Sequence, residues 1–179
     1  MILEILDSFL GKAESIILGG VPGNHGENRS GKTSVSTNRL DNADTASIQI
    51  VGEIIAGRER YKHVKVVVPD DFHLALEVFG KRIAFTHGHM TGGSGNPEAK
   101  IEKWWKGQMY GWLPVGDAEI LVTAHYHHLR MKQQGDRTWF QAPSIDKSID
   151  FTERTGLWSH PGVLTFTISN KGWDNYHPL

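Results

Sequence analysis

The chain has no cysteine among its 179 residues, which excludes disulfides, thiolate zinc sites and a cysteine nucleophile. Imidazole, carboxylate and amide groups remain as metal ligands, a set that suits Mn, Fe, Zn or Ni. The net charge is −1, so the protein as a whole does not attract nucleic acid or a membrane surface. The sequence also lacks a signal-peptide pattern and any apolar run near the roughly 20 residues that span a membrane. These absences predict a cytoplasmic protein.

Helical and strand-like periodicities predict a single α/β domain over residues 1–179, without repeats or linkers. Helices are expected at Ile2–Leu10, from Asp41 or Asp44 to about Ala56, and after Asn96-Pro97. Strands are expected at Ser15–Leu18, Val64–Val68, Leu74–Val78, Arg82–Thr86, Glu119–Thr123, Met131–Gln133, Thr138–Gln141 and Val163–Ile168, of which the last three are expected to be antiparallel.

Three histidine-bearing clusters each follow an apolar, strand-like run. They are Gly23-Asn24-His25, His87-Gly88-His89 and His125-Tyr126-His127-His128. In open α/β sheets, ligands bind beyond the carboxyl ends of the strands. We therefore expect the three clusters to meet at one edge of the sheet and to form a metal site.

The spacing within the last cluster suggests which side chains share a site. Residues two apart in an extended segment point to the same side, so His125 and His127 should face one site while Tyr126 points away. In the first cluster, the Asn24 carboxamide oxygen can bind a cation. His25 is adjacent in sequence and is better placed to donate a proton.

These three clusters resemble the last three motifs of the calcineurin-like metallophosphoesterase superfamily, which are Gly-Asn-His-Glu or Gly-Asn-His-Asp, a strand ending in His or His-Gly-His, and Gly-His-x-His. The resemblance covers the chain from about Ser15 onward and implies a sandwich of mixed β-sheets flanked by helices. Two local departures are Gly26, in place of the acidic residue, and Ala124, in place of a glycine.

The resemblance also implies a role for each matching residue. Asn24, His87 and His125 would hold one metal ion, and His127 would hold another. His25 would protonate the leaving group, and His89 would support the ligands from behind.

The superfamily's first two motifs, Asp-x-His and Gly-Asp-x-x-Asp, are missing from the 22 residues before Gly23. Asp71-Phe72-His73 has the spelling of the first motif, but it lies after Gly23 and therefore has the wrong place in the topology. The chain is accordingly expected to be an N-terminally incomplete domain whose first strands are missing. A hydrophobic edge beside Ile16–Leu18 would then favour self-association or a partner chain.

The implied activity is hydrolysis of a phosphoester, more specifically a diester, at a centre of two divalent metal ions. Nuclease-like and cyclic-nucleotide branches, in phages or bacteria, both remain open, so nucleic acid and cyclic nucleotides are both candidate substrates. Because Asn24, His87 and His125 are neutral and the bridging carboxylate is missing, this chain alone is expected to bind one ion weakly.

Two other functions compete with this one. Gly26–Thr33 matches the phosphate-binding loop G-x-x-x-x-G-K-[ST]. Such a loop precedes a helix, whereas the residues that follow here, Ser34 to Asn38, are poor helix formers. In the simpler interpretation this segment, part of the expected surface loop Glu27–Asn38, brings Arg29 and Lys32 to a substrate phosphate. The second alternative is a non-catalytic fragment that needs a partner chain.

The aromatic segment Lys103-Trp104-Trp105-Lys106, with Tyr110 and Trp112, fits two interpretations. It could stack nucleic-acid bases, or it could form the core face of an amphipathic helix, which is the more common case.

Overall fold

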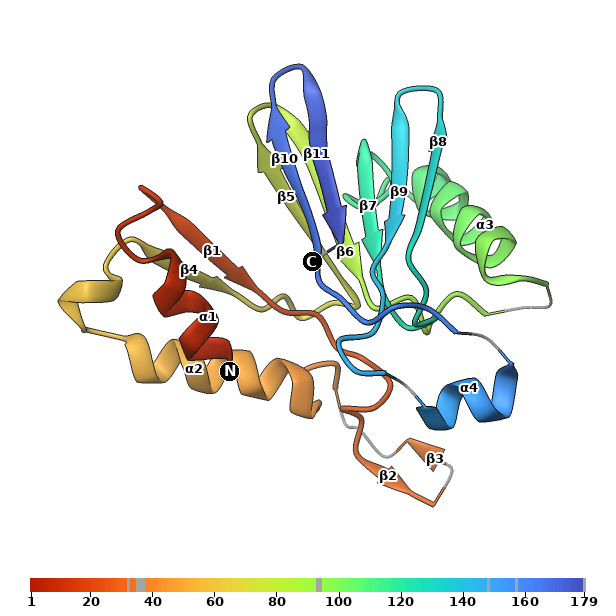
Figure 1. Cartoon of the computed structure of the whole chain (residues 1–179), viewed down its shortest axis with the longest axis horizontal. Helices are drawn as coiled ribbons and strands as arrows, with labels where there is room; N and C mark the ends of the chain where they lie inside the picture. The colour runs from red at the N-terminus through yellow and green to blue at the C-terminus, as the bar shows by residue number, and fades with distance from the viewer. Residues whose placement is uncertain (32, 35–37, 93–94, 148, 157, 179) are drawn as a thin grey trace. The chain divides into compact units, whose positions relative to one another are not determined.

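The computed structural model describes residues 1–31, 33–34, 38–92, 95–147, 149–156 and 158–178 (Figure 1). The chain divides into two compact units, Met1–Leu74 and Ala75–Leu179, and each is described by itself. The expectation of a single domain over residues 1–179 stays a prediction.

The first unit is built on two parallel strands, β1 and β4, whose register pairs Ile16 with Val64 and Gly19 with Val67. Its elements are α1 (Ile2–Phe9), β1 (Ile16–Gly19), β2 (Arg29–Ser30), β3 (Thr33–Ser34), α2 (Ala43–Ile55), the 3-10 turn η1 (Glu59–Tyr61) and β4 (Val64–Val67). The expected helices and strands of this unit are confirmed, and the expected loop at Glu27–Asn38 contains the short pair β2–β3.

Two helices cover the β1–β4 pair and form the core of the first unit. Leu6 of α1 lies in one cluster with Val51 and Ile55 of α2, and Tyr61 completes it. The helix α2 is capped by Asn42, whose side chain accepts a hydrogen bond from the Asp44 N–H. The expectation that Asp41 or Asp44 caps this helix was therefore wrong by one or two positions.

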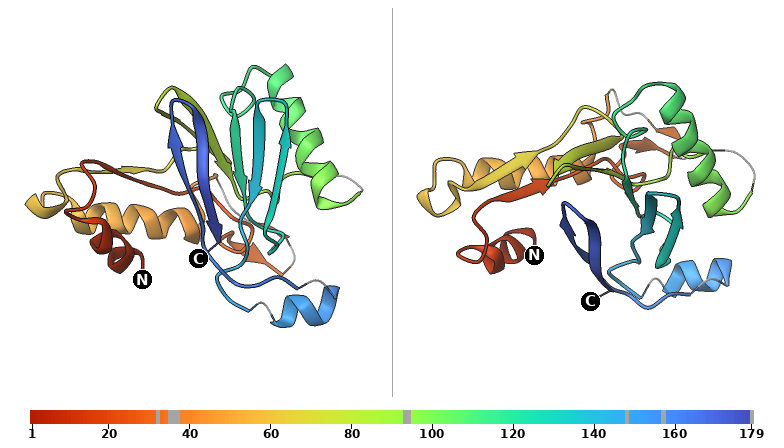
Figure 2. Two further views of the ribbon diagram at one scale, coloured as in Figure 1. Left: turned by 45° about the horizontal axis from the view of Figure 1, so that its top comes forward. Right: turned by 90° about the horizontal axis from the view of Figure 1, so that it is seen from above.

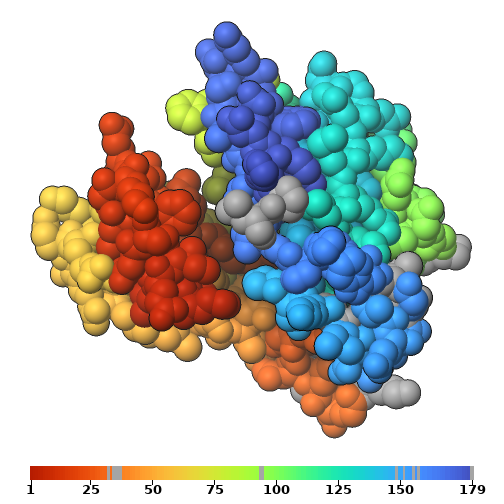
Figure 3. Space-filling model, viewed as in Figure 1, coloured from red at the N-terminus to blue at the C-terminus, as the bar shows by residue number. Residues whose placement is uncertain are grey.

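The helix α1 buries only part of the face that its spacing suggested. Helical spacing predicts one face with Ile2, Ile5, Leu6 and Phe9. Ile2 and Leu6 do pack in the core, whereas Ile5 and Phe9 are 54% and 52% exposed. Leu3 and Leu10 pack against the core instead. This helix, red in Figure 3, lies at the surface of its unit.

The second unit contains a five-stranded sheet with the strand order β5-β6-β7-β9-β8. Its elements are β5 (His73–Val78), whose first two residues count with the first unit, β6 (Lys81–Thr86), α3 (Pro97–Tyr110), β7 (Ile120–Thr123), β8 (Arg130–Gln134), β9 (Arg137–Gln141), α4 (Ile149–Thr155), β10 (Leu164–Ser169) and β11 (Gly172–Pro178). The strands β6, β7 and β9 are parallel, and β8 is antiparallel at the edge.

Both faces of this sheet are covered, as the two views of Figure 2 show: α3 lies on one face and the β10–β11 hairpin on the other. Successive side chains of a strand point to opposite faces. Leu121 therefore joins Ile101 and Trp105 of α3, while Ile120 joins the cluster that contains Trp173 of β11.

The architecture is mixed α/β, with a mixed sheet, a second small sheet packed on it, and flanking helices. The expected fold class is confirmed. Two features were unexpected. The strand β9 (Thr138–Gln141 in the prediction) is antiparallel to β8, as expected, but it is also parallel to β7. The strand β11, which pairs with β10, was not predicted. No described helix is long and apolar enough to span a membrane.

Candidate metal centre

Three histidines gather where two parallel strands of the second unit end. The register pairs Thr86 of β6 with Thr123 of β7, so the segments after these strands start level with each other. The ring centroid of His87 is 5.3 Å from that of His89 and 5.1 Å from that of His125, and His89 and His125 are 6.3 Å apart. The motif resemblance implied that His87 and His125 share one ion and that His89 supports the ligands. In the structure the rings of all three histidines lie within 6.3 Å of one another.

Hydrogen bonds tie the two histidine-bearing loops together. The Ala124 N–H donates to the His87 carbonyl (3.2 Å), and the Thr91 hydroxyl donates to the Gly88 carbonyl (2.8 Å). The same hydroxyl lies 3.2 Å from the phenol oxygen of Tyr126, whose ring contacts that of His125 at 4.8 Å between centroids. Tyr126 thus connects the two loops and supports an imidazole of the cluster.

The loop after β7 is not extended, which changes two expectations. His125 and His127 both have positive φ, at 65° and 56°, so the rule that residues two apart point to the same side does not apply to them. Tyr126 was expected to point away from the site, and this was wrong because its ring packs on His125.

A buried glutamine on β9 holds the far end of this loop. Gln141, which is fully buried, donates from Nε2 to the His128 carbonyl over 2.7 Å. The His128 ring in turn lies 3.1 Å from the Tyr126 carbonyl through Nδ1. Neither Thr91 nor Gln141 was anticipated, because only the strand register brings them to the histidine loops.

The three imidazoles fit a metal ion by donor type and by spacing. In a tetrahedral site with metal–nitrogen distances of about 2.0–2.1 Å, imidazole centroids stand about 5 Å apart. Two of the three separations have this value. In their present rotamers, however, no three His, Asp or Glu side chains among the described residues converge on one point.

Asn24 and His25 lie in the first unit, on a turn that follows β1. The N-terminus of α2 holds this turn, because the Gly23 N–H donates to Asp44 (3.1 Å) and Asn42 donates to the Gly23 carbonyl (2.8 Å). His25 is exposed. The ligand role of Asn24 and the proton-donor role of His25 stay predictions from the motif.

The glycine that replaces the motif's acidic residue has a steric reason. A Cβ at Gly26 would stand 2.3 Å from the Asn42 Oδ1 and 2.7 Å from the Asp44 Oδ2. Both are side chains at the start of α2, and one of them caps it. A larger residue at position 26 would therefore displace the helix cap.

The segment Gly26–Thr33 does not form a phosphate-binding loop, so this alternative was wrong. Such a loop leads directly into a helix, whereas here Arg29–Ser30 and Thr33–Ser34 pair as antiparallel strands. Arg29, expected at a substrate phosphate, instead donates to the Asn24 carbonyl (2.7 Å) and pairs with Glu27 (3.2 Å). Lys32 lies outside the described residues.

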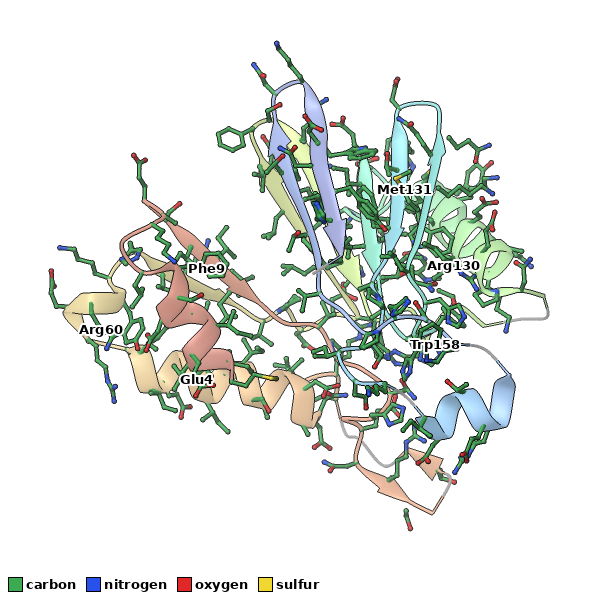
Figure 4. All side chains as sticks on the ribbon, viewed as in Figure 1. Glu4, Phe9, Arg60, Arg130, Met131 and Trp158 are labelled. Carbon is green, nitrogen blue, oxygen red and sulfur yellow. The ribbon has the colours of Figure 1, made fainter. Side chains whose placement is uncertain are left out.

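A cation stands at the same edge of the sheet as the histidines. Arg130 begins β8 and pairs in register with Gln141, the last residue of β9, and Figure 4 labels it there.

The aromatic segment of α3 contributes to the core of the second unit, which is the second of the two interpretations given for it. Trp105 is buried, and Trp104 packs against the core.

No protein-family model and no curated protein matches the chain. Among solved structures, it is similar to a conserved, uncharacterised protein from Streptococcus pneumoniae that is a predicted phosphoesterase, with 16% identity over 91% of this chain and 71% of the other and a TM-score of 0.42. It is also similar to Vps29 of Entamoeba histolytica, both as a single mutant (16% identity, 87% and 86% covered, TM-score 0.44) and as the wild type complexed with zinc (15% identity, 89% and 88% covered, TM-score 0.41).

These neighbours belong to the calcineurin-like metallophosphoesterase superfamily, the one that the three motifs resemble. Likeness at TM-scores below 0.5 carries no weight for the activity of this chain, so any function proposed for it has to rest on its own residues.

Proposed function

We propose that this protein is a metal-dependent phosphoesterase that acts on phosphodiesters. The observation that supports the proposal is the gathering of His87, His89 and His125 at the carboxyl ends of two parallel strands. Neutral imidazoles are common metal ligands, and the end of a parallel sheet is where α/β proteins bind substrates.

Each residue of the proposed site has a separate task. His87 and His125 hold a divalent cation, which supplies Lewis-acid polarisation of a phosphoryl oxygen and a water of lowered pKa. Tyr126 orients the His125 ring through their ring contact. Arg130, at the same edge, provides positive charge for a phosphate. By the motif resemblance, Asn24 and His127 are further ligands, and His25 protonates the leaving group.

The ligand set predicts weak metal binding. The proposed ligands are neutral, and a neutral ligand holds a dication less tightly than a carboxylate does. No carboxylate among the described residues joins the histidines in a group able to bind a metal. We therefore expect one ion per chain, and slower hydrolysis than a site with two bridged ions would give.

The test measures metal stoichiometry and turnover on the same samples. The chain is dialysed against Mn²⁺ or Zn²⁺, its metal content is measured by mass spectrometry, and hydrolysis of bis-p-nitrophenyl phosphate is followed. His125→Ala should lower both metal content and rate. His25→Ala should leave metal content unchanged and lower the rate by roughly 10²–10⁴-fold, the usual weight of general acid catalysis.

His177→Ala is the matched control, because His177 is an exposed histidine of β11 and should change neither quantity. Two tightly bound ions with fast turnover would show that the ligands are assigned wrongly. If the wild-type chain binds no metal and hydrolyses no diester, the phosphoesterase proposal fails. A non-catalytic role with a partner chain would then be the better interpretation.

A further inference from the structure

A separate cavity of about 200 Å³ lies in the second unit, between α3 and the strands β8 and β9. Its strand residues include Gln134 and Arg137, which pair where β8 ends and β9 begins. The histidines follow the opposite, carboxyl ends of the parallel strands β6 and β7, which run in the same direction as β9. The part of the cavity that Gln134 and Arg137 line is therefore at the other end of the sheet from the proposed metal centre.

The inner wall of the cavity is aromatic and apolar. Trp105 of α3 and Trp139 of β9 line it together with Ile101 and Met109. Both indole N–H groups are already used: Trp105 donates to the Val115 carbonyl (2.8 Å) and Trp139 to the Thr123 hydroxyl (2.9 Å). The two rings are thus held in place. Because Trp105 is 9% and Trp139 3% exposed, they offer a ligand a small area of apolar ring surface and no free hydrogen-bond donor.

The charged residues that line the cavity are three cations, Lys106, Lys132 and Arg137, and one carboxylate, Glu102. Lys132 is already engaged, since Glu102 and Glu98 both pair with it and raise the pKa of its ammonium group. Lys106 and Arg137 remain as the further cations of the lining. The Arg137 guanidinium donates to the Gly116 carbonyl (2.6 Å) and stands 5.6 Å from the centre of the Trp105 ring.

Arg137 is therefore fixed in place with donors to spare, because a guanidinium has five N–H groups and only one has a described partner in this structure. A second cation, Lys106, comes from α3, one residue after Trp105.

We propose that this cavity is a binding site for a small aromatic acid, meaning one planar ring system that carries a single carboxylate or phosphate group. The ring lies against Trp105 and Trp139, and the acid group meets Lys106 and Arg137. Aromatic rings favour stacked or edge-to-face contacts, and charge-assisted hydrogen bonds to an anion are about twice as strong as neutral ones.

The size of the cavity limits the ligand. Drug-sized ligands occupy sites of about 300–1,000 Å³, and this cavity is smaller. A single ring with an acid group fits it, whereas a dinucleotide or an oligonucleotide does not. The site is therefore not the binding place of a nucleic-acid substrate, and it is independent of the proposed metal centre.

The experiment follows the indole N–H signals of the six tryptophans by NMR in the full chain. Phenyl phosphate and phenylacetate are titrated in the presence of EDTA, which removes any metal and prevents hydrolysis. We expect saturable shifts of the Trp105 and Trp139 signals with both acids. Trp112 and Trp173, which do not line the cavity, serve as internal references.

Two further titrations and two variants test the contribution of charge. Benzyl alcohol has the ring without the acid, and inorganic phosphate has the acid without the ring, so both should bind at least tenfold more weakly. Lys106→Gln should weaken the binding of the acids by about tenfold, as expected for loss of a hydrogen bond to a charged group. Lys103→Gln, an exposed position on the same helix, is the matched control.

The relative affinity of the two acids identifies the preferred group, carboxylate or phosphate. The absence of saturable shifts at Trp105 and Trp139 would overturn the proposal. Equal weakening by Lys103→Gln and Lys106→Gln would do the same, since it would indicate a general charge effect. Failure of metal binding at the histidines would leave this result untouched, so the two proposals can be separated.

Discussion

At the scale of single residues, two side-chain contacts of Tyr126 matter for the proposed site. Its ring packs on His125 and its hydroxyl lies 3.2 Å from that of Thr91, which is itself bonded to the Gly88 carbonyl. A variant that lacks only the hydroxyl would lose the contact with Thr91 and keep the ring contact with His125, so it tests the link between the loops alone.

We predict that Tyr126→Phe keeps the fold and weakens metal binding by up to about tenfold, because residues that orient metal ligands have effects of about 10–100-fold when they bond to them directly. Isothermal titration with Zn²⁺ measures the affinity. Tyr110→Phe, at an 87% exposed position, is the control. An affinity equal to that of the wild type would mean that Thr91 and Tyr126 do not position His125.

Tyr176 gives a second prediction at this scale. Its ring stacks on Phe140 with 5.2 Å between centroids, and burial raises its pKa above the ordinary value of 10.0. The unfolded chain therefore loses this proton first as the pH rises. The free energy of unfolding should fall as the pH increases above about 10, and Tyr176→Phe should reduce that fall. Urea unfolding at pH 8 to 11 measures it, with Tyr110→Phe again as the control; identical pH profiles for Tyr176→Phe and wild type would contradict it.

At the scale of elements, two glycines in α3 and in the turn after it differ in whether they leave space for a side chain. A Cβ at Gly116 would lie 2.6 Å from backbone atoms of Gln108 and Met109, while a Cβ at Gly107 would meet nothing within 4 Å. Backbone cannot move aside as a flexible side chain can, so only the first position needs glycine.

Gly116→Ala should lower the free energy of unfolding by about 1–3 kcal/mol or more, the cost of overpacking a buried site. Gly107→Ala should raise it by up to about 1 kcal/mol, because alanine is the better helix former. Chemical denaturation of the two variants provides the comparison. Equal and small effects would mean that the turn after α3 does not pack closely on the helix.

Sequence patterns predicted where helices and strands begin and end better than they predicted which faces are buried and which strands pair. Asn96 and Pro97 placed the start of α3 correctly, since cap chemistry is local and the Asn96 side chain does accept from the Ala99 N–H. The predicted core face of α1 was right for Ile2 and Leu6 and wrong for Ile5 and Phe9, because in so short and apolar a helix several faces have suitable spacing. The pairing of β9 with β7 was also missed, because strand neighbours depend on the whole sheet.

At the scale of the whole molecule, the apolar surface of the first unit calls for an explanation. Met1, Ile5 and Phe9 recur every four residues along α1 and are all more than half exposed. Ile17 of β1 is 47% exposed as well. A row of exposed apolar side chains such as Met1, Ile5 and Phe9 often marks a site of association.

We predict that the chain associates with itself at high concentration and that Phe9→Glu weakens this association, because a charge would have to be buried in the contact. Light scattering over a concentration series measures it. Phe79→Glu, at the exposed turn between β5 and β6, is the control. A chain that stays monomeric at every concentration would show that the apolar stripe of α1 does not mediate association.

Local sequence patterns were enough to predict the order of most elements, the N-cap of α3 and the three histidine clusters, because these follow from the periodicity and chemistry of neighbouring residues. Three features could not be predicted in this way and arise only in the folded chain: His89 joins His87 and His125, Tyr126 packs on His125, and Thr91 and Gln141 hold the two loops. These contacts depend on strand register and on positive φ angles, which bring distant residues together and which no local pattern encodes. The cavity beside Trp105 and Trp139 likewise exists only because α3 packs across β9, so its lining comes from parts of the chain more than 30 residues apart.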